Sequence, residues 1–300
     1  MAKILITDGM DQEKAQELKE MGHTLIEEKV SPEELLERIK EVDAVIIRSR
    51  TKITKEVVDA AVAGGQLKVA IRAGIGLDNI DVAYATEKGI AVYNTPNSSA
   101  NSVAELALAQ MINIARHIPL ANAEMEDGAW NKSKYSGVEI MGKTLGLIGY
   151  GRIAKSLADK AEALGMKVVF TDIGEVEPNG RQKVTMDELF EQADFISLHI
   201  PGGQGNYHLI DDEQFNKMKD CVYLVDLARG GVVSEEALLR ALNSGKVKAA
   251  ALDVFEEEPT KNMELVCHPN VAVTPHIGAA TAEAQKRIGE EIVQIIRENF

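Results

Sequence analysis

The sequence has almost no cysteine and no long apolar run. Its 300 residues include two cysteines, Cys221 and Cys267. Two cysteines this far apart in a long chain indicate free thiols in a reducing compartment, so we expect a cytoplasmic protein. No apolar stretch reaches the ~18 residues that a membrane helix needs. The first residues, MAKILITDGM, lack the basic and apolar regions of a secretory signal. We therefore expect no contact with a membrane.

Basic residues are also in short supply. The chain has 33 Lys and Arg against 47 Asp and Glu, a formal net charge of −14. Proteins that bind nucleic acids usually present a basic face, so this balance argues against a nucleic-acid partner. It does not exclude an anionic small molecule, because a local cluster of arginines can outweigh the global field. Short repeats and low-complexity tracts are absent as well.

Ten short runs rich in Val, Ile and Leu predict β-strands. Most are apolar at consecutive positions, which is typical of strands buried on both faces of a parallel sheet. They form two groups, before and after a segment at 101–119: 3–8, 44–49, 68–73 and 90–94, then 145–149, 167–172, 195–200, 222–227, 249–254 and 271–276. Helical patterns alternate with them, most clearly at 152–164 before Gly165. This alternation predicts a doubly wound α/β fold.

The segment between the two groups predicts a buried helix over 103–115. Ser102 and Glu105 have the spacing of a capping box at its start. The stretch LALAQMINIA that follows is apolar almost all round, and a helix of that kind must be covered on several sides. We expect this cover to come from the boundary between domains or from a dimer interface, and so predict a homodimer.

A glycine-rich turn predicts a dinucleotide site. Gly149, Gly151 and Ala154 lie between a predicted strand and a predicted helix, in the sequence LGLIGYGRIA. The first glycine permits a tight turn, the second lets the backbone approach a pyrophosphate, and the small third residue lets the helix pack on the strand. Asp172 ends the next strand, where a carboxylate can bind the adenosine ribose and repel a 2′-phosphate. We therefore expect the cofactor to be NAD.

Polar residues follow three of the later strands. Arg229 stands before two glycines, Glu258 ends an acidic run after Asp253, and His276 follows the last strand. Ligands of open α/β sheets lie beyond the carboxyl ends of the strands, so these side chains should face the cofactor. Oxidation of a hydroxy acid needs a base such as histidine, a carboxylate to orient it, and a cation for the substrate carboxylate. Taken singly, each residue could equally be a cap, an ion-pair partner or part of a solvated loop.

With these residues in place, the chain resembles the D-isomer-specific 2-hydroxyacid dehydrogenases. The matching stretches run in the family's order from residue 46 to residue 281: IIRSRTKIT, IRAGIGLDNID, YNTPN, SVAEL, GKTLGLIGYGRIA, DLARGGVV, ALDVFEEEP and TPHIGAAT. The resemblance implies two Rossmann-like domains with the active site in the cleft between them. It places a substrate-binding domain at 1–98 and 281–300, and an NAD-binding domain with a dimerisation arm at 99–280.

The resemblance also implies residue roles. Arg229, Glu258 and His276 are implied as the catalytic set. Further cofactor contacts are implied, beyond Gly149, Gly151 and Asp172, at Arg152, Ile153, His199, Pro201, Ala228, Asp253 and Gly278. Substrate contacts are implied at Arg48, Ser49, Arg72, Gly74, Ile75, Gly76 and Lys132. No metal site is expected.

Three activities are compatible with this resemblance. The sequences around Arg48 and Arg72 are most similar to those of family members that oxidise D-3-phosphoglycerate to 3-phosphohydroxypyruvate, the first step of serine biosynthesis. Reduction of glyoxylate, hydroxypyruvate or another 2-keto acid is the alternative within the family. The alternative among proteins that are not enzymes is an NAD-sensing co-repressor, which has the same fold and binds peptide motifs.

Overall fold

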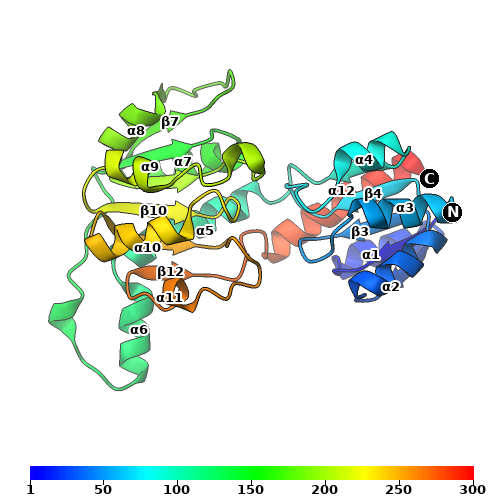
Figure 1. The fold of residues 1–300 in the computed structure, drawn as a ribbon, viewed down its shortest axis with the longest axis horizontal. Helices are drawn as coiled ribbons and strands as arrows, with labels where there is room; N and C mark the ends of the chain where they lie inside the picture. The colour runs from blue at the N-terminus through cyan, green and yellow to red at the C-terminus, as the bar shows by residue number, and fades with distance from the viewer. The chain divides into compact units, whose positions relative to one another are not determined.

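The computed structural model describes residues 1–300 and divides them into two compact units (Figure 1). Unit 1 comprises Met1–Ser99 and Ala279–Phe300, and unit 2 comprises Ala100–Gly278. Each unit has its own sheet of parallel strands, and helices pack on both of its faces. The predicted doubly wound α/β architecture is thereby confirmed. None of the helices has the length and apolar character that crossing a membrane requires.

Unit 1 is built on a five-stranded sheet of order β2-β1-β3-β4-β5. Its strands are β1 (Lys3–Ile6), β2 (Thr24–Glu27), β3 (Ala44–Ile47), β4 (Val69–Arg72) and β5 (Ala91–Asn94). Its helices are α1 (Gln12–Glu20), α2 (Pro32–Arg38), η1 (Ile39–Glu41), α3 (Lys55–Gly64), α4 (Val82–Glu87) and α12 (Ala282–Asn299). The strand order reverses direction between β1 and β3, and in such sheets the crevice for a ligand opens at this point.

Alternate residues of the unit 1 strands enter two separate cores. Leu5 and Val45 pack with α2 and α3 on one face of the sheet. Ile4 and Ile46 pack on the other face with α1 and with Ile292 of α12. The last helix of the chain thus completes the first unit. Because helices cover both faces of the sheet, its strands appear in the sequence as continuous apolar runs rather than alternating ones.

Unit 2 has a seven-stranded sheet of order β12-β11-β10-β9-β6-β7-β8. Its strands are β6 (Thr144–Ile148), β7 (Lys167–Thr171), β8 (Gln182–Lys183), β9 (Phe195–Leu198), β10 (Val222–Asp226), β11 (Val247–Leu252) and β12 (Val271–Val273). Counted from β6, this is the dinucleotide-binding order, and the direction reverses between β6 and β9. The glycine-rich turn that follows β6 therefore lies at the switch point.

Nine helical segments belong to unit 2: α5 (Ala100–Ala115), α6 (Ile118–Glu126), η2 (Lys132–Lys134), α7 (Arg152–Ala163), α8 (Met186–Gln192), η3 (Gln204–Asn206), α9 (Asp212–Lys217), α10 (Glu235–Ser244) and α11 (Met263–Val266). The helices α8 to α11 cover one face of the sheet, and α5 and α7 cover the other. The predicted helix at 152–164 is observed as α7, with Gly165 in the left-handed region beyond its end.

Helix α5 differs from the expectation in two respects. It begins at Ala100, so Ser102 lies inside the first turn, and the predicted capping box was wrong. It packs against α7 and against β10, β11 and β12 of its own unit. Met111, for example, is fully buried there. Most of the apolar surface of α5 is therefore covered within its own unit, although Leu106, Leu108 and Ile112 are only partly buried.

Candidate active site

The glycine-rich turn after β6 has the geometry of a pyrophosphate site. Gly149 has φ +85°, and a Cβ there would lie 2.6 Å from the carbonyl oxygen of His199. At Gly151 an added Cβ would meet nothing within 4 Å, so the backbone is open on that side. Gly151 caps α7 without any side-chain hydrogen bond. The first amides of α7, including those of Arg152 and Ile153, are consequently available to an anion at the positive end of the helix.

Asp172 is held against this turn. One carboxylate oxygen accepts the amide hydrogen of Tyr150 at 2.7 Å, and the other accepts that of Gly174 at 2.8 Å. These two bonds connect the end of β7 to the glycine-rich turn, and they orient a half-buried carboxylate with acceptor capacity to spare. The position suits a ribose hydroxyl pair and is unfavourable for an additional phosphate.

Replacing Asp172 by Ala tests this assignment. Loss of a charge-assisted hydrogen bond should raise the KM for NAD about tenfold or more, and the bias against NADP should shrink. Steady-state kinetics with both cofactors measures the two effects. Glu175, an exposed acid nearby, supplies the control, since Glu175→Ala should leave both values nearly unchanged. Wild-type enzyme that used NADP as efficiently as NAD would contradict the role given to Asp172.

His199 follows β9 and lines the other side of the glycine-rich turn. Its Nε2 lies 3.0 Å from the Ser197 hydroxyl oxygen. Burial lowers the pKa of His199 to about 4, so the ring is neutral at physiological pH. Pro201 follows as an exposed residue. The cofactor contacts implied for these two residues stay predictions.

Arg229 lies on a tight turn after β10. Asp226 accepts the amide hydrogen of Ala228 at 2.9 Å, and the Arg229 guanidinium donates to the Ala228 carbonyl at 2.5 Å. The turn then passes directly over the loop after β11: a Cβ on Gly230 would lie 1.7 Å from the carbonyl oxygen of Phe255. Only glycine permits this approach, which brings Arg229 to the loop that contains Glu258.

His276 and Glu258 form a hydrogen-bonded pair in unit 2. His276 Nδ1 lies 2.7 Å from a Glu258 oxygen. Burial acts to raise the pKa of Glu258, but the hydrogen bond with His276 and the nearby charges of His276 and Arg229 outweigh it and lower this pKa. Glu258 is thus an anion at neutral pH. Because an ionised carboxylate only accepts hydrogen bonds, Nδ1 carries the proton and Nε2 is left as a base.

Asp253 holds the loop on which His276 lies. Its buried carboxylate accepts hydrogen bonds from the Thr274 hydroxyl at 2.6 Å, the Ile277 amide at 2.9 Å and the Gly278 amide at 2.8 Å. His276 itself has φ +53°, an uncommon backbone conformation for a residue other than glycine. Asp253 therefore stabilises a strained turn at the site. Sequence reasoning missed this role, although an acid ending an apolar strand was a usable signal.

Two polar residues organise the basic loop of unit 1. Asp8, at the end of β1, accepts the Arg48 amide at 2.8 Å and the Arg50 Nε at 2.8 Å. Burial acts to raise the pKa of Asp8, yet these and other hydrogen bonds lower it, so Asp8 is an anion. Asn79 donates to the carbonyls of Arg48 and Thr51, each at 2.6 Å. Sequence reasoning missed Asp8 and Asn79, because each stands in a motif that was interpreted through its neighbouring residues.

Arg48 and Arg72 end adjacent strands at the same edge of the sheet. Ile47 pairs with Arg72 in register, so Arg48 follows one residue further on. The Arg50 guanidinium is paired with Asp8, whereas that of Arg48 makes no hydrogen bond or ion pair. Ser49 is exposed beside it. The side chains of Arg48 and Lys52 are the basic groups of this loop without a partner; that of Arg48 is half-buried at the end of β3, whereas that of Lys52 is exposed.

The Gly74–Gly76 segment continues this edge. The Arg72 guanidinium lies over Gly74, because a Cβ there would come 1.4 Å from Arg72 Nη1. Asn94 donates to the Ile75 carbonyl at 2.6 Å and fixes the segment. The amides of Ile75 and Gly76 donate to no group of the chain, as a backbone nest for an anion requires. Lys132, in contrast, belongs to unit 2, where it is exposed beside Trp130.

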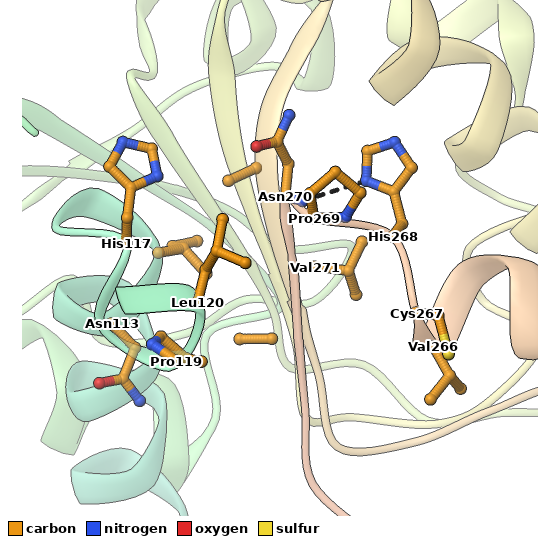
Figure 2. Close-up of a pocket in the computed structure, with 13 residues that line it drawn as sticks. Asn113, His117, Pro119, Leu120, Val266, Cys267, His268, Pro269, Asn270 and Val271 are labelled. Carbon is orange, nitrogen blue, oxygen red and sulfur yellow. Dashed lines mark hydrogen bonds between the residues drawn. The ribbon is translucent and has the colours of Figure 1, made fainter. Parts of the chain in front are cut away.

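A separate pocket of about 200 Å³ lies in unit 2 between the start of α6 and the strand β12. Figure 2 shows His117 and Leu120 on one side of it and Pro269, Asn270 and Val271 on the other. His268 Nδ1 accepts the amide hydrogen of Asn270 at 3.2 Å. None of the predicted site residues lines this pocket, so it is distinct from the catalytic set.

Comparison with known proteins defines the family. The model of the D-isomer-specific 2-hydroxyacid dehydrogenase NAD-binding domain matches residues 108–278. Hydroxypyruvate reductase of Thermotoga maritima is 46% identical, over 98% of this chain and 97% of that protein. D-3-phosphoglycerate dehydrogenase of Methanocaldococcus jannaschii is 45% identical over 99% of this chain, which spans 58% of its length. The solved glyoxylate reductase of Paecilomyes thermophila superposes with a TM-score of 0.90 at 32% identity, covering 98% and 94% of the two chains.

The fold and the site thus define an oxidoreductase that uses a dinucleotide. The chain belongs to the D-isomer-specific 2-hydroxyacid dehydrogenase family, and its cofactor is NAD. The residues present fit that cofactor, since the open backbone at Gly151, the uncapped start of α7 and the oriented Asp172 match a pyrophosphate and a ribose. Among the interpretations of the sequence, the comparisons support the enzyme rather than the co-repressor.

Proposed function

We propose that this enzyme oxidises D-3-phosphoglycerate at C2 to 3-phosphohydroxypyruvate, the first step of serine biosynthesis. The observation that carries the proposal is the unpaired Arg48 guanidinium beside Arg72, at the switch point of the unit 1 sheet. A substrate with a phosphate and a carboxylate has two anionic ends. Arg229 supplies a cation for the carboxylate, and Arg48 supplies one for the phosphate.

The three catalytic residues accept the substrate proton, stabilise the imidazolium that results and bind the substrate carboxylate. Neutral His276 accepts the hydroxyl proton at Nε2 as C2 is oxidised, and Glu258 stabilises the imidazolium that forms. Arg229 binds the substrate carboxylate and so orients C2 toward the base. NAD, when bound, takes up the hydride. In the reverse direction the imidazolium returns its proton to the carbonyl oxygen of the keto acid.

A second candidate is reduction of hydroxypyruvate or glyoxylate by the same residues. It is favoured by the hydroxypyruvate reductase of Thermotoga maritima, which is 46% identical to this chain. The chain spans 48–58% of the length of three relatives that are named for phosphoglycerate. The chemistry at C2 is identical for the two candidates, so the binding of the phosphate decides between them.

Arg48→Ala tests this choice. If Arg48 binds the phosphate, the variant should lose about 10²-fold in kcat/KM with 3-phosphoglycerate, because truncating one partner of a charged pair costs a few kcal/mol. Turnover should fall as well, since binding energy from a remote group also orients C2. Reduction of glyoxylate, which has no phosphate, should change much less. Arg48→Lys should recover only part of the loss, because lysine lacks the forked geometry.

Lys52 provides a matched control on the same loop. Its side chain is exposed and makes no ion pair, so Lys52→Ala should leave both reactions nearly unchanged. Equal losses on both substrates in Arg48→Ala would mean that Arg48 supports the fold or the carboxylate, and the phosphate assignment would be abandoned. Wild-type enzyme with activity on hydroxypyruvate or glyoxylate alone would support the second candidate.

We also propose a cytoplasmic homodimer. Both cysteines are free thiols, as a reducing compartment favours. Because most of α5 is covered within its own unit, support for the dimer comes from the next segment. Helix α6 has no buried residue, and Met125 and Trp130 expose 57% and 80% of their surface. Apolar surface of this kind is typical of an interface. Lys132 lies in the same segment and would approach a neighbouring subunit.

Light scattering at micromolar concentration measures the assembly. The expected mass is twice the 32.6 kDa of the chain. Replacing Met125 and Trp130 together by Ser should shift the mass toward that of the monomer, because the substitution removes apolar contacts from the interface. A monomeric wild-type protein would contradict the proposal.

A further inference from the structure

One buried carboxylate next to the catalytic set has no part in the mechanism above. Asp226 is the last residue of β10, and 2% of its surface is exposed. Its carboxylate accepts the amide hydrogens of Ala228, at 2.9 Å, and of Arg229. Its backbone carbonyl accepts the amide hydrogen of Asp253 at 2.9 Å. Asp226 therefore fixes the turn on which the Arg229 side chain lies.

The surroundings of Asp226 are mostly apolar and acidic. Burial raises the pKa of this carboxyl to about 7, against the opposing effects of the Ala228 amide and the Arg229 charge, while Asp253 raises it further. Glu235 of α10 and Glu256 of the loop after β11 line a small cavity with Asp226. On β9 its register partner is Leu198, which does not titrate. Arg229 is thus the only cation among these neighbours.

We propose that Asp226 is a positioning residue for Arg229, and that its negative charge weakens the binding of the substrate carboxylate until Asp226 takes up a proton. An anion bound at Arg229 partly neutralises the cation that stabilises the ionised Asp226. Binding and protonation therefore favour each other, and the coupling is reciprocal. Substrate affinity should fall as the pH rises through neutrality. The proposal rests on the role given above to Arg229, but not on the identity of the substrate.

Calorimetric binding of oxalate, an inert dicarboxylate, tests the coupling. The measurement uses enzyme saturated with NAD in a His276→Ala background, because this substitution removes the catalytic base from the place where the ligand binds. Between about pH 6 and pH 8 the dissociation constant should rise about fivefold or more, a typical coupling. Buffers of different ionisation enthalpy should show proton uptake on binding. Adding Asp226→Asn keeps a side-chain oxygen that accepts the two amide hydrogens but removes the ionisable carboxyl. The rise of the dissociation constant with pH and the proton uptake on binding should then both vanish.

Thermal unfolding gives a readout that does not depend on substrate. A carboxyl whose pKa is raised by folding contributes stability at low pH, and that contribution is lost as the pH rises through the folded value near 7. The melting temperature of Asp226→Asn relative to wild type should therefore increase from about pH 5 to pH 8. Asp187→Asn, which alters an exposed acid of the same unit, should show no such trend.

The two measurements separate the possible failures. A stability difference that does not vary with pH would overturn the titration of Asp226, and with it the proposal. The coupling would be overturned if the stability trend were as expected but oxalate binding depended equally on pH with and without Asp226→Asn in the His276→Ala background. Oxalate binding that is unaffected by Arg229→Ala would instead locate the error in the role of Arg229, and so in the proposed function.

Discussion

His276→Ala should lower kcat by about 10²-fold or more in both directions, the usual scale of general acid–base catalysis. A carboxylate fixes the orientation of the imidazole, with Nδ1 2.7 Å from Glu258 and Nε2 left to accept the substrate proton. The change in NADH absorbance measures turnover. The KM for NAD should stay close to that of wild type, because the dinucleotide turn after β6 lies outside the altered loop.

His208 offers a closely matched control for this variant. Its Nε2 lies 3.0 Å from Glu256, so it forms a second histidine–glutamate pair in the same unit. His208→Ala should leave kcat within about threefold of wild type, in the range of a surface pair of little energetic value. Glu258→Gln should lower kcat by less than His276→Ala but by more than His208→Ala. Glutamine keeps the contact with His276 but no longer stabilises the imidazolium. Near-normal turnover in His276→Ala would refute the assignment of the base.

Arg229→Ala should reduce kcat/KM for the acid substrate by about 10²-fold or more, because a substrate carboxylate would lose its charged partner. KM and kcat should both suffer, since the guanidinium binds the substrate and also orients C2. Arg229→Lys should recover only part of the activity: an ammonium group cannot make the two parallel hydrogen bonds that a guanidinium makes with a carboxylate. Steady-state kinetics with varied acid substrate at saturating cofactor measures both parameters.

Arg240 is the control for this second variant. It is an exposed residue of α10 that is paired with Asp212, and its replacement by Ala should change neither parameter appreciably. Fluorescence titration with NADH shows whether the cofactor still binds to Arg229→Ala. A variant that lost NADH binding together with activity would indicate that Arg229 supports the fold of the cofactor site, and that another cation binds the carboxylate.

Most of the two sheets was predictable from short apolar runs, and the exceptions share a physical cause. All ten predicted strands are present, but β2 and β8 were missed. Both lie toward a sheet edge and are half-buried or exposed, so their sequences carry little of the apolar signal. Polar residues at strand ends were equally informative, because parallel strands present their carboxyl ends at one edge. The His276–Glu258 pair was anticipated in this way.

Long-range contacts were beyond such reasoning. The cover over α5 is provided by α7 and by three strands that follow it much later in the chain, and an apolar helix by itself does not say which surface will cover it. The residues that hold the site residues in place could not be recognised from the sequence either. Asp8 holds a loop about forty residues further along the chain, and Asp253 holds the turn of His276, yet in the sequence both are simply acids that follow apolar runs.

The kind of fold, the dinucleotide turn and the types of catalytic residue follow from the amino-acid sequence alone, because each depends on local periodicity or on the spacing of neighbouring residues. The polar groups that hold these residues in place become apparent only in the folded chain. The fold pairs Asp8 with the Arg48 loop, joins Asp226 to the turn that holds Arg229, and leaves the Arg48 guanidinium without a partner while that of Arg50 is paired. Such choices depend on burial and on contacts between distant segments, which form only when the strands are aligned in their sheets.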